Sequence, residues 1–178
     1  MQTQEQVKNS NLVTGMFTDR DSAERAYDAL REKGYSKDEI NLIMSDETRK
    51  RHFGDTVEKT ELGNKALEGA GTGSAIGGTI GAIVGVVAAL GTSLLIPGLG
   101  IVVAGPIAAG LAGAGAGGAT GGIIGALIGS GIPEERAVVY EKGIKDGRIV
   151  MGVHARNNED AQYFENDWRN NNVTEVHR

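Results

Sequence analysis

The stretch 69–133 constrains this chain most, because it carries no charged side chain and glycine recurs at every fourth position in two series. The series are Gly73, Gly77, Gly81 and Gly85, followed by Gly113, Gly117, Gly121, Gly125 and Gly129. Residues four apart lie on one face of a helix, so each series would give a helix a stripe without side chains. Such stripes allow two helix backbones to approach closely, as small residues do in membranes. The pattern predicts a glycine zipper.

The simplest arrangement of this stretch is a helical hairpin. We expect its arms at about 73–96 and 101–130, with a turn at Pro97 and Gly98. The part 75–96 is long enough to cross a hydrocarbon core, which needs about 20 residues. The tip 94–103 is apolar, however, whereas a tip emerging into water would be polar. A hairpin that spans the bilayer, one that re-enters it and one buried in a soluble oligomer therefore all stay open.

The flanks predict a small α+β domain. Before the insertion, we expect a strand, a helix that begins after Thr18 and ends at Gly34, and a second strand. After it, we expect a helix opened by Pro133 and ending at Gly143 or Gly147, then a strand, a helix capped by Asn157 and a last strand. The four strands are expected at 11–17, 39–45, 148–155 and 173–177.

The two flanks also resemble each other. The tripeptide at 13–15 matches 150–152 at an offset of 137, and four helix positions match at an offset of 138. Two β-α-β units make the plan of a ferredoxin-like sandwich, in the usual strand order 4-1-3-2. The predicted organisation is a disordered arm at 1–10, the first half of the domain with a linker at 11–68, the glycine-rich helical hairpin at 69–133, and the second half at 134–178.

Composition and charge exclude several classes of function. The chain has no cysteine, so disulfides and thiolate metal sites are excluded. Its net charge is −5 with both signs mixed in each flank, which gives no basic footprint for nucleic acid. The polar N-terminus shows no signal-peptide pattern, and we therefore expect the charged domain in the cytoplasm.

No motif in the sequence predicts catalysis, a cofactor or a metal. The run at 71–77 resembles a nucleotide loop but has the wrong spacing and no following Lys-Ser/Thr. His52, His154 and His177 form no ligand pattern, and His154 and His177 are expected on strands that are not neighbours. The basic run at 49–51 would suit anionic lipid, but acidic residues flank it, which favours an exposed linker. The aromatic residues at 163, 164 and 168 are expected to pack a helix on the sheet.

A family resemblance is carried by three stretches, VTGMFTDRDSAERAYDALREKGYSKDEINLI, IPGLGIVVAGPIAAGLAG and GGIIGALIGSGIPEERAVVYEKGIKDGRIVMGVHA. Together they resemble a family of bacterial general stress or low-temperature-induced proteins, often described as membrane proteins. The resemblance covers about residues 11–178 and departs from the family at 170–172, where asparagine stands in place of a glycine-containing helix end. It implies a stress-associated protein with a glycine-zipper membrane segment, and brings no catalytic residues.

Three hypotheses follow. The first is a non-enzymatic, membrane-associated stress protein that oligomerises through the hairpin, with itself and the lipid bilayer as partners. The second is a soluble self-assembling shell or filament with the hairpins buried inside. The third is a ligand-sensing ferredoxin-like module, for which the sequence offers no convergent polar cluster and no identified small molecule.

Overall fold

The computed structural model describes residues 11–57, 94–96, 100–108, 122–171 and 173–178. These residues form an α+β fold around one antiparallel sheet in the order β3-β4-β2-β5-β1-β6. The strands are β1 (Leu12–Phe17), β2 (Ile40–Ser45), β3 (Leu94–Ile96), β4 (Ile101–Ala104), β5 (Ile149–His154) and β6 (Thr174–His177). The helices are α2 (Arg20–Glu32), α3 (Asp46–Val57), α8 (Gly122–Gly129), α9 (Glu134–Lys145) and α10 (Asn158–Asn170), with a short 3₁₀ turn at Lys37–Glu39.

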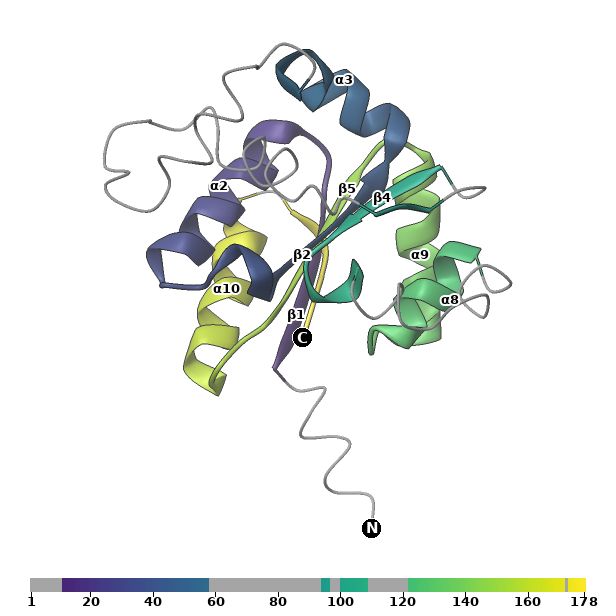
Figure 1. Ribbon diagram of the computed structural model, residues 1–178. Helices are drawn as coiled ribbons and strands as arrows, with labels where there is room; N and C mark the ends of the chain where they lie inside the picture. Colours follow the sequence, from purple (N-terminus) through teal and green to yellow (C-terminus); the bar gives the residue numbers. More distant parts are fainter. Residues whose placement is uncertain (1–10, 58–93, 97–99, 109–121, 172) are drawn as a thin grey trace.

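Helices cover both faces of the sheet (Figure 1). On one face, α2 and α10 bury an apolar core that includes Leu30, Phe164 and Trp168. On the other face, α8 and α9 bury a second core that includes Leu127 and Ile144. Alternate residues of a strand point to opposite faces, and the central strands are buried on both because both faces are covered.

The four strands expected from the flanks lie in the predicted order 4-1-3-2, as β6-β1-β5-β2. At the centre of the sheet, Thr14 pairs with Gly152 and Gly15 pairs with Met151. The sequence repeat, with its offset of 137, relates Thr14 to Met151 and Gly15 to Gly152, so it converts each of these pairs into the other. The two halves therefore meet about a pseudo-two-fold axis. The internal repeat therefore corresponds to a symmetry of the sheet.

The two equivalent helices also begin alike. Asp19 accepts a hydrogen bond from the Ser22 amide at 2.8 Å, and Asn157, at an offset of 138, accepts one from the Asp160 amide at 2.7 Å. The expected cap at Asn157 is confirmed, whereas the cap of α2 is Asp19 and not Thr18. The carboxylate of Asp19 satisfies a free amide of the first turn, as N-cap residues do.

The helical prediction is wrong for the middle of the apolar stretch. Residues 94–96 and 101–104 form β3 and β4, which pair antiparallel, and β4 extends the sheet along β2 from Leu42↔Ala104 to Ser45↔Ile101. Ile101, Val102 and Val103 are buried. These residues are β-branched, a class that packs well on a pleated sheet, and β2 supplied a partner strand. Residues 101–104, which include the end of the apolar tip, thus belong to the domain core.

Glycine ends three of the helices in the left-handed conformation that other residues disfavour. Gly34 follows α2 with a φ of 82°, Gly131 follows α8 with a φ of 89°, and Gly147 follows α9 with a φ of 89°. The expected stops at Gly34 and Gly147 are therefore confirmed. Gly143, the other stop considered for α9, lies inside that helix.

Two segments of this region lie outside the described residues: positions 58–93, between Val57 of α3 and Leu94 of β3, and positions 109–121, between Ala108 and Gly122 of α8. In the part of the chain that the structure describes, no helix has the length and apolar character needed to cross a bilayer.

Candidate functional site

Two glycines of the predicted zipper lie in the described part of the chain, Gly125 and Gly129 of α8. No described atom lies within 4 Å of a Cβ built on either residue. Next to them, 42% of Ile128 is exposed. We call these three residues the α8 glycine face; the opposite side of α8 buries Ile123 and Leu127.

The other predicted zipper positions lie outside the described residues, namely Gly73, Gly77, Gly81, Gly85, Gly113, Gly117 and Gly121. Pro97 and Gly98, the predicted turn, also lie outside them. The residues on either side of them, Ile96 and Ile101, pair across β3 and β4.

A glycine does allow a close approach within the domain, at a position the zipper prediction did not include. Gly143 of α9 is buried against β1, and a Cβ added there would overlap the sulfur of Met16. Gly15 behaves similarly on the other face, where a Cβ would lie 2.9 Å from the Trp168 ring. At both positions, a side chain from the neighbouring layer packs against the backbone of the glycine.

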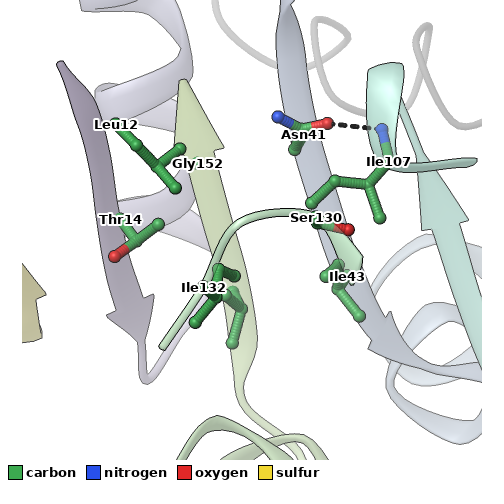
Figure 2. Close-up of a pocket in the computed structure, with 9 residues that line it drawn as sticks. Leu12, Thr14, Asn41, Ile43, Ile107, Ser130, Ile132 and Gly152 are labelled. Carbon is green, nitrogen blue, oxygen red and sulfur yellow. Dashed lines mark hydrogen bonds between the residues drawn. The ribbon is translucent and has the colours of Figure 1, made fainter. Parts of the chain in front are cut away.

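A small cavity separates the sheet from the segments that flank α8. Figure 2 shows side chains from β1, β2 and β5 on one side and Ile107, Ser130 and Ile132 on the other. Its volume is about 10 Å³, room for about one water molecule. It is therefore too small for an organic ligand.

Asn41 lines this cavity and binds the backbone of the segment that follows β4. Its side chain is buried, and its Oδ1 accepts a hydrogen bond from the Ile107 amide at 2.8 Å (Figure 2). Next along the chain from β4, Gly105 has a φ of 89°, and a Cβ there would overlap the main-chain oxygen of Ile40. These two contacts hold the 105–108 segment against the edge of β2.

A buried hydroxyl pair joins α9 to the edge of the sheet. Tyr140 Oη lies 2.9 Å from the main-chain oxygen of Glu175 and 2.8 Å from Thr14 Oγ1. A carbonyl only accepts, so Tyr140 donates its single proton to Glu175 and accepts from Thr14. Burial raises the pKa of Tyr140 to about 12, so the phenol stays protonated at neutral pH.

The carbonyl that Tyr140 binds belongs to a backbone irregularity. Glu175 has a φ of 53°, a left-handed conformation that non-glycine residues rarely adopt. The register of β1 and β6 shifts here, between Thr14↔His177 and Met16↔Thr174. The bulge turns the Glu175 carbonyl toward α9 and so ties β6 to that helix.

A second polar cluster joins the two halves at the start of α10. The Tyr35 hydroxyl donates to Asp160 Oδ2 at 2.8 Å and accepts from the Arg156 amide at 2.8 Å. The Arg156 guanidinium lies over the Tyr35 ring, 4.4 Å from its centre, and binds both carboxylate oxygens of Glu39, the closer at 2.7 Å. Arg156, with the Ser36 amide, lowers the pKa of Glu39 to about 2.

The candidate histidines at 154 and 177 lie on strands that are not neighbours. His154 and His177 lie on β5 and β6, which β1 separates, as expected. Among the described residues, no three His, Cys, Asp or Glu side chains form a group that could hold a metal ion.

The basic run lies on α3, and its charges are paired locally. Arg49 and Lys50 both contact Asp46, at 2.9 and 2.8 Å, and Arg51 contacts Glu47 at 2.7 Å. Their charge is thus balanced by carboxylates one turn away. The expected exposed linker is wrong at this position, because the run is part of a helix.

The aromatic residues of α10 pack mainly as expected. Phe164 and Trp168 are buried, and Trp168 meets Phe17 edge to face at 5.5 Å. Tyr163 instead lies at the surface, where the Lys33 ammonium is 4.3 Å from the centre of its ring.

Comparison of the chain with family models, with curated proteins and with solved structures found no match. Function must therefore be inferred from the site. Sequence reasoning missed the Tyr35–Arg156 and Tyr140–Glu175 contacts, because each joins residues more than thirty positions apart. The left-handed Glu175 left no sequence signal.

Proposed function

We propose that this chain is a non-enzymatic, membrane-associated stress-response protein built on a ferredoxin-like domain and oligomerising through its glycine-rich segment. The strand order β6-β1-β5-β2, with α2 and α10 on one face, supports the ferredoxin-like assignment. The stress association comes from the family resemblance in the sequence, and the charged domain is assigned to the cytoplasm.

The observation that carries this proposal is the α8 glycine face. It continues the second glycine series out to the surface of the domain, where Gly125 and Gly129 have room for another backbone. A neighbouring helix could approach this stripe more closely than a face with side chains, gaining dispersion contacts. The same face carries exposed Ile128, which a partner would remove from water.

The lengths of the two glycine-rich segments between described parts of the domain limit how they could enter a bilayer. The 36 positions 58–93 begin and end at the domain, next to Val57 and Leu94. Crossing a bilayer and returning would take about 40 residues, since each crossing needs about 20. The 13 positions 109–121 are shorter still. We therefore favour entry into one leaflet, a re-entrant arrangement, over a hairpin that spans the membrane.

The polar side chains of the domain support a scaffold without catalysis. Tyr140, Thr14 and Asn41 each bind main-chain or side-chain groups that hold secondary-structure elements together. Of the three side chains, the Tyr140 phenol is the one that could act as a general acid, and its proton is used to bind the Glu175 carbonyl.

The alternative is a soluble assembly in which the glycine-rich segments pack only against protein. The burial of Ile101, Val102 and Val103 in the domain favours it, because the most apolar part of the stretch no longer needs lipid. Flotation with liposomes of anionic and zwitterionic lipid separates the two: the membrane protein rises with the vesicles, and the soluble assembly stays below as a large lipid-free species.

Replacement of Gly125 and Gly129 by leucine tests the glycine face. Leucine would hold a partner backbone away, so we expect smaller oligomers in light scattering and weaker flotation. Gln162→Leu, on the exposed surface of α10, is the control for added apolar surface. Unchanged oligomer size and flotation in the double leucine variant would refute the proposal.

A further inference from the structure

The outward face of α9 is apolar in the middle and oppositely charged at its ends. Val138 and Val139 are 49% and 40% exposed, two of the four large hydrophobic side chains exposed in the described residues. Exposed Glu135 precedes them by one turn and exposed Lys142 follows by one turn. Residues three, four and seven apart share a helix face, so these four side chains form one surface, which we call the α9 face.

The other side of the same helix is fully used by the domain. Ala137, Tyr140 and Ile144 are buried against the sheet. The charged side chains of the α9 face form no ion pair within the domain. Among the described residues, neither Glu135 nor Lys142 has an ion-pair partner, whereas Lys145 of the same helix contacts Glu141 at 3.1 Å. The α9 face is thus an unpaired surface on a fixed helix.

We propose that the α9 face binds the α9 face of a second copy of this chain, with the two helices antiparallel. A two-fold axis between Val138 and Val139 places the valines of both copies at the centre. It also sets Glu135 of each copy opposite Lys142 of the other, so the same ion pair forms twice. The charge order along the helix favours this partner because an isologous contact requires a self-complementary surface.

The antiparallel direction has further support from the helix ends. Antiparallel helices set the positive N-terminal end of one dipole beside the negative C-terminal end of the other. Asp146, the C-cap of α9, would lie just beyond the first turn of the second helix, where a carboxylate is favoured. A parallel pair would instead oppose Glu135 to Glu135 and Lys142 to Lys142.

This contact lies outside the glycine series and goes beyond the proposed function. A helix of 12 residues is about 18 Å long, so the buried area would fall below the roughly 1,000 Å² of a stable interface. Alone it would be weak, but it would gain from any other contact that holds two copies together, since the second contact then forms at high effective concentration.

Charge exchange across the two-fold axis provides the test. In Glu135→Lys or Lys142→Glu alone, both ion pairs become repulsive, and we expect sedimentation velocity of the full chain to show at least tenfold weaker association. In an equimolar mixture, the lysine introduced in one variant faces the glutamate introduced in the other, and the native pair forms at the opposite end. Association should therefore return to the wild-type level. A mixture that stays as weak as the single variants would overturn the proposal.

Cysteine crosslinking gives a second, independent readout, because the native chain has no cysteine. Val138→Cys should form a disulfide-linked dimer on mild oxidation, whereas Gln162→Cys, also at an exposed position but on α10, should not. Equal crosslinking of both variants would refute the α9 contact. The glycine variants separate this proposal from the proposed function. If they lose association but still crosslink normally at position 138, the α9 contact stands. If their association is unchanged, the glycine proposal alone is refuted.

Discussion

Gly143 of α9 lies directly over Met16 of β1, with no room for a side chain between them. The absence of a Cβ lets α9 settle on the sheet and brings Tyr140, one turn earlier, within reach of Thr14 and the Glu175 carbonyl. The glycine therefore lets the helix lie close over the Met16 side chain, at a distance from the sheet at which the buried hydroxyl pair forms.

Gly143→Ala should lower the free energy of unfolding by about 1–3 kcal/mol, the usual cost of forcing extra volume into a packed core. Urea denaturation followed by circular dichroism would measure it. The matched control is Gly125→Ala in α8, where the space is open and the better helix propensity of alanine should stabilise the domain by up to about 1 kcal/mol. Equal effects at both positions would contradict the packing described for α9.

Tyr140→Phe should destabilise the domain by about 1–3 kcal/mol, because the Glu175 carbonyl loses its donor and the buried Thr14 hydroxyl loses its acceptor. Thr14→Val, which removes the hydroxyl that donates to Tyr140, should cost less in the Tyr140→Phe background than in the wild type. A double-mutant cycle from urea midpoints measures this coupling. Strictly additive costs would show that the two hydroxyls do not interact.

Acid should weaken the contact between Glu39 and Arg156. The pKa of Glu39 is lowered from 4.5 to about 2 in the folded state, so the folded state binds its proton less tightly than the unfolded chain does. The contribution to stability is fully present above pH 4.5 and is lost as the pH falls toward 2. Because the pair is exposed, solvent screening makes this contribution small.

Glu39→Gln should therefore reduce stability at pH 7 and lose less of it on acidification than the wild type does. Urea midpoints measured from pH 7 to pH 2 would show the two curves converging at the acid end. Glu32→Gln, at an exposed position on α2, serves as the control. Parallel curves for Glu39→Gln and the wild type would contradict the linkage.

Asn41→Ala should release the 105–108 segment from the sheet. The Ile107 amide loses its buried acceptor, a cost of about 1–3 kcal/mol. Hydrogen exchange of that amide, followed by NMR, should become at least tenfold faster, while the amides of β1 and β5 change only with global stability. Asn170→Ala, at the exposed end of α10, controls for loss of an asparagine. An unchanged Ile107 exchange rate would refute the role given to Asn41.

The sequence by itself determined the local features of this protein. The β-α-β order, the cap at Asn157 and the helix ends at Gly34 and Gly147 follow from residues within a few positions of one another. Hydrophobic periodicity and the backbone freedom of glycine suffice for these features. The repeat between the halves likewise predicted the strand order β6-β1-β5-β2.

Only the tertiary structure decided which secondary structure the described part of the apolar stretch adopts. A short run such as 101–104 is equally consistent with a buried helix and a buried strand, and the distant β2 selected the strand by offering its unpaired edge. The contacts of Tyr140 with Glu175 and of Tyr35 with Arg156 arose in the same way. Each joins residues far apart in the chain, and its free energy exists only once the sheet has brought them together.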